Sequence, residues 1–154
     1  MDVSSIDISA SGMRAQRLRM DLIANNLANV DTTSASQEVR RTPDGQSYVR
    51  HVPYRRKLAV FLQGTPAKGN KVFGVAAPQV VDDASPFRLE HNAAHPHAVP
   101  SSSGDKDAGF VYFPNVHPLL ETVDMMAAAR AYEANLTAVD MFKSMSAATM
   151  RLLA

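Results

Sequence analysis

The sequence predicts an α+β protein in which two long terminal helices pack as an antiparallel, coiled-coil-like pair with a small β-rich module inserted between them. Apolar residues recur at three- and four-residue spacing near both ends of the chain, as in amphipathic helices. The segment between these ends is interrupted by Pro and Gly and is rich in β-prone residues. We therefore expect a helical core domain made of residues 1–33 and 116–154 and a middle module at residues 34–115.

Length and composition restrict the possible classes of protein. The chain has 154 residues, of which 45% are hydrophobic and 20% charged, which favours one folded domain over extended disorder. Its formal net charge of +1 gives no reason to expect a nucleic-acid partner. The absence of cysteine excludes disulfides, thiolate catalysis and cysteine zinc sites. No apolar run reaches the ~18 residues of a membrane span, and we expect no direct membrane insertion and no cleaved signal peptide.

The N-terminal helix is expected over about residues 8–33. Apolar residues repeat at seven-residue spacing with one intervening d-like position, which is typical of a helix that packs along a partner. Leu18 and Leu22 form a second apolar row that one partner helix would leave uncovered. The main stripe contains Ile6, Met13, Met20 and Leu27, with Ile23 and Val30 at the intervening d-like positions.

Asn25, Asn26 and Asn29 lie near the end of this helix, although Asn disfavours helix interiors. Two interpretations are open at this point. The amides can weaken the last turns by bonding to nearby backbone groups. Alternatively, they can form hydrogen bonds across a subunit interface and fix its register, as a polar residue does in a coiled coil.

The C-terminal helix is predicted from about residue 118 to 152. Pro118 suits the first helical turn, where the missing N–H has no partner in any case. Leu119, Met126 and Met141 lie outside the main stripe, which predicts an interaction surface beyond a simple helical hairpin. Methionine-rich stripes are typical of plain core and also suit contacts that are not identical. The main stripe contains Met125, Ala129, Tyr132, Leu136, Val139, Phe142, Ser146, Met150 and Leu153.

The middle module is predicted to be built from short strands. Residues 36–51 read as a hairpin whose turn, Thr42–Gly45, has Pro and Gly at the positions that a type I turn favours. Two further β-prone runs lie at 53–64 and 71–81. Short extended pieces at 86–89 and 110–113 flank a loop rich in Pro, Ser, His and Gly.

The candidate chemical groups of the chain do not form a recognisable catalytic or metal motif. His91, His95, His97 and His117 are interpreted as solvated loop histidines, since Pro96 prevents a regular helical pair of ligands and no cysteine is present. The basic run 55–57 is interpreted as a solvated strand face or a protein contact. We assign no catalytic residue, metal ligand or cofactor and expect a protein that is not an enzyme.

Two motifs resemble those of a known family. ASGMRAQRLRMDLIANNLANVDTT (10–33) is similar to the N-terminal signature of the flagellar axial proteins, which are the rod and hook subunits of the bacterial flagellum. RAYEANLTAVDMFKSM (130–145) resembles their C-terminal signature. The short chain and the FVYFPNV lead (110–116) into the last helix are most similar to a subunit of the proximal rod.

The resemblance implies a structural subunit of the flagellar basal body that assembles helically into the tubular drive shaft, transmits torque and supports motility. The implied partners are copies of the chain, other rod subunits (FlgB, FlgF, FlgG and FliE-type) and the flagellar type III export apparatus. The implied location is the periplasmic rod, and no cofactor is implied. Candidate subunit-interface residues are Met13, Met20, Ile23, Asn25, Asn26, Leu27, Asn29, Met125, Tyr132, Asn135, Leu136, Val139, Phe142 and Met150.

Two alternatives remain at this point. The chain can be another axial protein of the same family, either another proximal rod subunit or a short distal-rod or hook-type subunit. From a different class, the end helices can bind a membrane surface, but the C-terminal helix has few of the basic groups that such binding requires.

Overall fold

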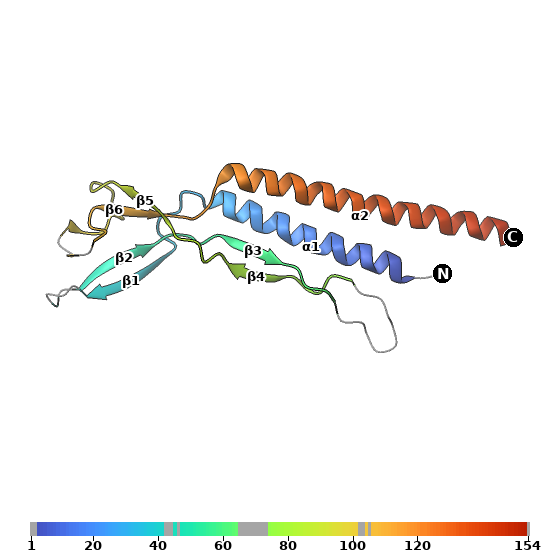
Figure 1. Cartoon of the computed structure of the whole chain (residues 1–154), viewed down its shortest axis with the longest axis horizontal. Helices are drawn as coiled ribbons and strands as arrows, with labels where there is room; N and C mark the ends of the chain where they lie inside the picture. The colour runs from blue at the N-terminus through green and yellow to red at the C-terminus, as the bar shows by residue number, and fades with distance from the viewer. Residues whose placement is uncertain are drawn as a thin grey trace. The chain divides into compact units, whose positions relative to one another are not determined.

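The computed structural model describes residues 3–41, 45, 47–64, 74–101, 104 and 106–153. Within these residues, a long helix lies near each end of the chain and six short strands lie between the two helices in sequence, which confirms the α+β class (Figure 1). The expected turn at Thr42–Asp44 and the expected linker within 65–70 lie outside the described residues. The elements are α1 (Val3–Ala28), β1 (Ser36–Arg41), β2 (Ser47–Val52), β3 (Lys57–Val60), β4 (Gln79–Asp82), β5 (Arg88–His91), β6 (Phe110–Phe113) and α2 (Pro118–Leu153).

The residues group into two compact units. Unit 1 comprises Met1–Ala24, Leu58–Val81 and Thr122–Ala154, and unit 2 comprises Asn25–Lys57 and Asp82–Glu121. The segment 34–115, which we expected as a single middle module, therefore contributes residues to both units. The three-part domain division stays a prediction.

In unit 1, α1 and α2 run antiparallel to each other (Figure 1). Arg19 on α1 forms an ion pair with Asp124 on α2, with 3.1 Å between Nη2 and Oδ1. Further along, a Cβ at Gly12 would lie 3.2 Å from the side-chain amide nitrogen of Asn135. The expected pairing of the terminal helices is confirmed.

Small residues allow the two helices to approach closely. Ser9 and Ala15 on α1 and Ala128 on α2 are buried, as are the larger Ile23 and Val139. The apolar spacing of the sequence predicted Ile23 and Val139 but not Ala128, because it gives weight to large apolar side chains. Short side chains at a helix contact bring the two backbones together and leave little free volume.

The helix α1 ends at Ala28, five residues before the position expected from the sequence. Beyond it, the Asn29 side-chain amide donates to the carbonyl oxygen and to the side-chain oxygen of Asn25, each at 2.9 Å. Thr32 Oγ1 donates to Asn29 Oδ1 at 3.1 Å. These bonds satisfy groups that the helix end leaves open, and the chain turns at residues 29–31.

The helix α2 begins at Pro118, as predicted, and continues to Leu153. Proline at the first helical position loses no hydrogen bond, because the first N–H groups of a helix have no intrahelical acceptor. The first turn also contains Glu121, whose backbone N–H donates to the His117 carbonyl oxygen at 3.0 Å.

The strands form three two-stranded sheets, with orders β1-β2, β3-β4 and β5-β6. The strands β1 and β2 are antiparallel with Val39 opposite Val49, which confirms the predicted hairpin strands. The strands β5 and β6 are also antiparallel, with His91 opposite Phe110. The run expected at 71–81 forms only the strand β4 and a single bridge, from Val75 to Gln63, among its described residues.

Ala128 tests the close helix contact of unit 1. Ala128→Leu adds three carbon atoms at a position with no exposed surface, and we expect it to lower the free energy of unfolding by about 1–3 kcal/mol because the helices must separate. The measurement is urea unfolding followed by circular dichroism. The neighbouring exposed site gives a matched control, Ala127→Leu, with an expected change within about 0.5 kcal/mol. Equal stability of the two variants would contradict the contact.

Candidate functional site

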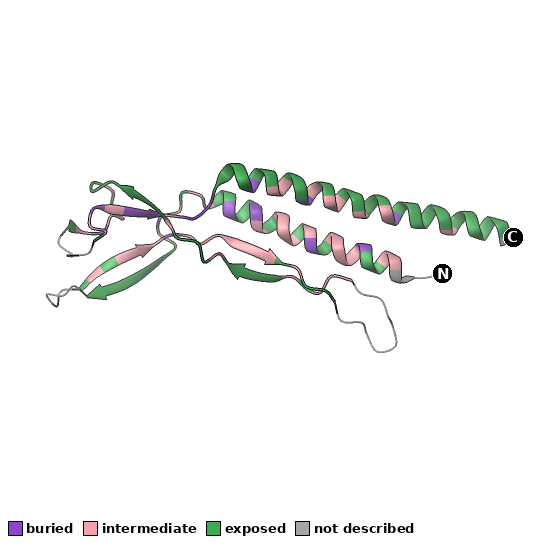
Figure 2. Ribbon diagram, viewed as in Figure 1, coloured by how far each residue is buried: buried purple, intermediate pink, exposed green. Residues whose placement is uncertain are grey.

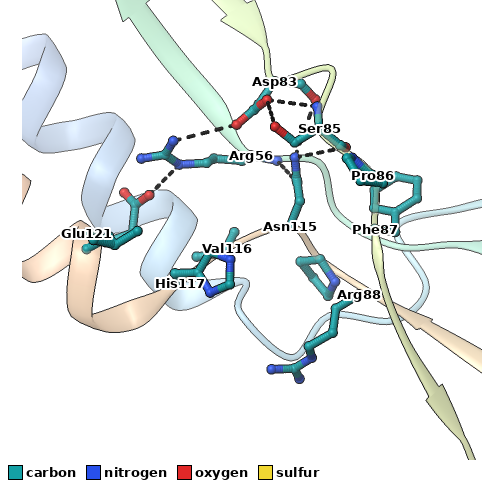
Figure 3. A pocket seen from close by; sticks show the side chains of 12 residues that line it. Arg56, Asp83, Ser85, Pro86, Phe87, Arg88, Asn115, Val116, His117 and Glu121 are labelled. Atoms are coloured by element: carbon teal, nitrogen blue, oxygen red, sulfur yellow. Dashed lines mark hydrogen bonds and ion pairs between the residues drawn. The ribbon is translucent and has the colours of Figure 1, made fainter.

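A buried ion pair lies at the first turn of α2 in unit 2. The side chain of Glu121 has no exposed surface. The Arg56 guanidinium donates from Nε to Glu121 Oε1 at 2.5 Å, and its Nη1 lies 3.6 Å from Asp83 Oδ2 (Figure 3). Burying a carboxylate is costly unless it is paired and hydrogen-bonded, so Arg56 is the group that allows Glu121 to remain inside.

Asn26 adds the second half of this cluster. Its Oδ1 accepts hydrogen bonds from the Lys57 backbone N–H and the Tyr54 hydroxyl, both at 2.9 Å. Its Nδ2 donates to the Lys57 carbonyl oxygen at 2.9 Å and to Glu121 Oε2 at 3.3 Å. A side chain in this position must donate and accept at once, which an amide does and a carboxylate does not. Asn26 thus ties the last turn of α1 to the beginning of β3 and to α2.

This arrangement gives Asn26 a role inside the chain that neither sequence interpretation included. Its side chain is almost completely buried, with 1% of its surface exposed. A contact of Asn26 with another subunit stays a prediction.

Asn115 holds the backbone next to the ion pair. Its Oδ1 accepts the Arg56 backbone N–H at 2.9 Å, and its Nδ2 donates to the carbonyl oxygens of Asp83 and Ser85, both at 3.4 Å. Arg55 Nη1 also donates to the Asp83 carbonyl oxygen, at 2.7 Å. The interpretation of 55–57 as a solvated face or a protein contact was wrong for Arg55 and Arg56, because both guanidinium groups bond within the chain.

A recess of about 440 Å³ lies beside this cluster in unit 2 (Figure 3). Its polar side is formed by the paired groups described above. Apolar side chains line the rest of the recess, so it is able to receive an apolar group. These apolar residues are Pro86, Phe87, Pro114, Val116 and Leu120.

A large exposed apolar surface of unit 1 lies on α2. At 3.6 residues per turn, the positions of its residues place this group on the side of the helix opposite Ala128 and Val139, which are buried. Figure 2 shows most of α2 in the exposed class. We call this group the outer face of α2: Val123, Met126, Met141, Met145 and Leu152, with exposures from 51% to 88%.

The structure divides the predicted interface residues into three groups. Ile23, Asn26 and Val139 are buried within the chain. The half-buried residues are Met13, Met20, Asn29, Met125, Tyr132 and Asn135. The exposed residues, whose side chains are accessible to a partner, are Asn25, Leu27, Leu136, Phe142 and Met150.

The sequence predicted apolar residues on each terminal helix that the other helix would leave uncovered, and the structure differs between the two helices. Leu119, Met126 and Met141 are exposed, as expected for α2. Leu18 and Leu22 are half-buried, so the second row on α1 is less accessible than the sequence suggested.

Sequence reasoning missed Glu121, Arg56 and Asn115 as members of one cluster. The one local signal was an acidic residue in the first turn after Pro118, which favours a helix N-terminus whether or not the carboxylate is buried. The partners lie far away along the chain, and Asn26 and Glu121 are separated by 95 residues.

Comparison with known proteins identifies the class to which this fold belongs. A family described as "Flagella basal body rod protein" matches residues 6–35, and one described as "Flagellar basal body rod FlgEFG protein C-terminal" matches residues 107–152. These ranges include most of α1 and nearly all of α2, and the second also includes β6. The fold and both signatures are therefore those of flagellar basal-body rod proteins.

Curated relatives define the family more closely. The flagellar basal-body rod protein FlgC of Borreliella burgdorferi is 39% identical, over 97% of this chain and 96% of its own length. The FlgC proteins of Bacillus subtilis and Salmonella typhimurium are 36% and 35% identical, over 92% and 95% of this chain and 91% and 93% of their own lengths. The chain belongs to the FlgC family of flagellar basal-body rod proteins, which are structural proteins.

Within the described residues, neither helix is long and apolar enough to cross a membrane.

Glu121→Gln tests the buried ion pair. Glutamine keeps the volume of the side chain but removes the charge that faces Arg56, and we expect the free energy of unfolding to fall by about 3 kcal/mol. Urea unfolding of the whole chain measures the change. Glu133→Gln, at an exposed position of the same helix, is the matched control and should change stability by less than about 0.5 kcal/mol. A Glu121→Gln protein as stable as the control would show that the pair contributes little.

Asp83 gives the cluster a dependence on pH. Hydrogen bonds from the Ser85 side chain and backbone, and then the nearby Arg56, lower the pKa of Asp83 below its ordinary value of 3.8. Because the folded pKa is depressed, this contribution to stability is present above the ordinary value and is lost as pH falls through the lower folded pKa. We expect Ser85→Ala to raise the pKa of Asp83, measured by NMR titration of its carboxyl carbon. An unchanged midpoint would contradict this cause.

Proposed function

We propose that the protein is a structural subunit of the proximal part of the flagellar rod. In this proposal, copies of the chain and other rod subunits of the FlgB, FlgF, FlgG and FliE type pack through their end helices into a helical tube that transmits torque. Residues 1–33 and 116–154 act as the helical core domain, and residues 34–115 act as the middle module. The curated relatives are named as flagellar basal-body rod proteins, which supports the rod as the assembly that this chain joins.

The observation that carries the proposal is the outer face of α2. One side of α2 packs on α1, while the opposite side leaves five large apolar side chains at least half exposed. Covering half of such a side chain is worth about 1 kcal/mol, so several together can stabilise a subunit contact. Exposed apolar groups that continue along a helix favour a protein contact over free solvent.

The different lengths of the two helices support the same proposal. The helix α2 has 36 residues and α1 has 26. The last turns of α2 extend past the beginning of α1 (Figure 1). Met150 and Leu152 lie in these turns with 64% and 88% of their surface exposed. A helix end with such exposed apolar side chains is available to a neighbouring subunit.

The geometry of the proposed contacts is heterologous. The outer face of α2 differs from the face that carries α1, and it would meet a different surface on the next subunit. Contacts of this kind do not close on themselves and generate helical filaments or tubes. The expected setting is a rod in the periplasm, whose subunits leave the cytoplasm through the flagellar type III export apparatus.

The proposed role is mechanical and includes no catalytic step. The buried polar groups of unit 2 are paired with one another: Arg56 with Glu121 and Asp83, and Asn26 with Lys57 and Tyr54. Such pairing supports a structural rather than a reactive use of these groups. The alternative within the family, another axial subunit, is less favoured because the FlgC relatives match over more than nine-tenths of the chain.

Met141→Asp tests the outer face of α2. The side chain is 61% exposed, so the substitution should leave the free energy of unfolding of the isolated chain within about 0.5 kcal/mol of its original value. In the assembled rod it would bury an unpaired charge, which is strongly unfavourable. We expect a strain that depends on this variant to lose swimming in soft agar and to yield no rod-containing basal bodies.

Ala147→Asp is the matched control. Ala147 is exposed and follows Glu133 and Asp140 at seven-residue spacing, so the new carboxylate extends an existing acidic row on another side of α2. This variant should remain motile. A motile Met141→Asp strain with normal basal bodies would refute burial of the outer face. Loss of motility in both variants, with soluble protein retained, would show that the whole circumference of α2 is sensitive to charge.

A further inference from the structure

Three histidines pack against one another in unit 2. His51 belongs to β2, while His95 and His97 belong to the segment between β5 and β6. The rings of His51 and His97 are stacked with 4.3 Å between their centroids, and His95 meets His97 edge-on at 5.3 Å. The interpretation of His97 as a solvated loop residue was wrong, because its half-buried ring lies in contact with both other rings.

Each ring also has a hydrogen bond at Nδ1. His97 Nδ1 lies 2.7 Å from Thr33 Oγ1, and His51 Nδ1 lies 2.8 Å from Ser34 Oγ. His95 Nδ1 accepts the backbone N–H of His97 at 3.1 Å. An accepting nitrogen carries no proton, so this last bond requires the neutral form of His95.

No carboxylate balances a positive charge on these rings. Among the residues that the structure describes, the ion pairs join arginines to Asp or Glu and none includes a histidine. The charged groups that act on His97 are His51 and His95. No group of three His, Asp or Glu side chains in the described part of the chain is placed to hold a metal ion.

The cluster joins separate parts of unit 2. Thr33, Ser34 and His51 come from the segment Asn25–Lys57, and His95 and His97 come from Asp82–Glu121. Just beyond His97, the Val99 backbone N–H donates to the Phe110 carbonyl oxygen at 3.0 Å. The Gly109 N–H donates to the Val99 carbonyl oxygen at 2.9 Å. The loop that carries the two histidines is therefore attached to β6 at one end and to β2 through the rings.

We propose that His51, His95 and His97 form an acid-sensitive clasp that holds the loop 92–99 against β2 and the Thr33–Ser34 segment when the rings are neutral and releases it when they are protonated. Two adjacent imidazolium rings at 4–5 Å repel each other, and protonation of His95 at Nδ1 removes its hydrogen bond to His97. The clasp makes the local structure of unit 2 sensitive to mildly acidic pH. This property goes beyond the proposed structural role.

Burial and then the two neighbouring histidines lower the pKa of His97 below its ordinary value of 6.5. The direction of this pKa shift agrees with the geometry, because a lowered histidine pKa means that the folded state favours the neutral ring. The clasp is complete above the ordinary value and opens as pH falls through the lower folded pKa.

NMR of the uniformly labelled full chain tests the clasp directly. Between pH 8 and pH 4.5, the His97 imidazole should titrate below the ordinary histidine range of about 6.5, and the amide signals of Thr33, Ser34 and Ala98 should move with the same midpoint. Hydrogen exchange at Val99, corrected for its intrinsic pH dependence, should become up to about tenfold faster for each pH unit between the ordinary value of about 6.5 and that midpoint, and should level off below it.

A substitution separates charge from packing. His51→Phe keeps a planar ring against His97 but cannot be protonated, and we expect it to reduce the acid-induced increase in Val99 exchange at least severalfold. His117→Phe is the matched control and should leave that increase unchanged. If His97 in the original chain titrates in the ordinary range, or if Val99 exchange does not respond to acid, the clasp does not exist. The original chain alone decides this, even if His51→Phe fails to fold.

Discussion

Glu121 brings a carboxylate into the interior of unit 2 at the point where α2 begins, and the surrounding contacts of this unit depend on how that charge is satisfied. Arg56 supplies the counter-charge, and Asn26 supplies a further donor from the end of α1. Arg56 is held in turn by Asn115 at its backbone and by Asp83 at its guanidinium. Burying any one of these groups without its partners would be costly. The network is therefore cooperative and is stable only when all of its members are in place.

This buried polar network gives unit 2 one specific geometry, whereas apolar packing alone would tolerate several arrangements of the backbone. Its buried apolar residues are few, with Val99, Val111, Tyr112 and Val116 among them. Apolar contacts tolerate small shifts, whereas a carboxylate, a guanidinium and an amide require defined directions and distances. A buried ionic network is weak evidence for high stability. Its main effect here is to fix the direction of the backbone at residues 56 and 57. The Arg56 N–H donates to Asn115, and the N–H and C=O groups of Lys57 both bond to Asn26.

Local sequence patterns predicted the elements of the fold but not the cluster that connects them. The heptad spacing, Pro118 and the β-prone runs each act over a few residues, and they correctly predicted two terminal helices and the hairpin strands. The close packing at Gly12 and Ala128 was not predicted, because it requires small residues that apolar periodicity does not weigh. Asn26 was noticed as an unusual residue, yet its partners Tyr54, Lys57 and Glu121 could be found only once the chain was folded. In the same way, β3, β4 and β5 separate His51 from His97 in the sequence, so local patterns could not predict their contact.

Asn26 has one more effect, which follows from its two bonds to Lys57. A strand that ends a sheet presents free N–H and C=O groups, and these can pair with a strand of another molecule. At the first residue of β3, a single amide side chain occupies both groups. The same contact that orders unit 2 therefore removes a point at which foreign β-strands could add. Before assembly, the chain exposes apolar side chains on α2, namely Met126, Met141, Met145 and Met150. One fewer site for strand pairing reduces the ways in which such a chain can aggregate.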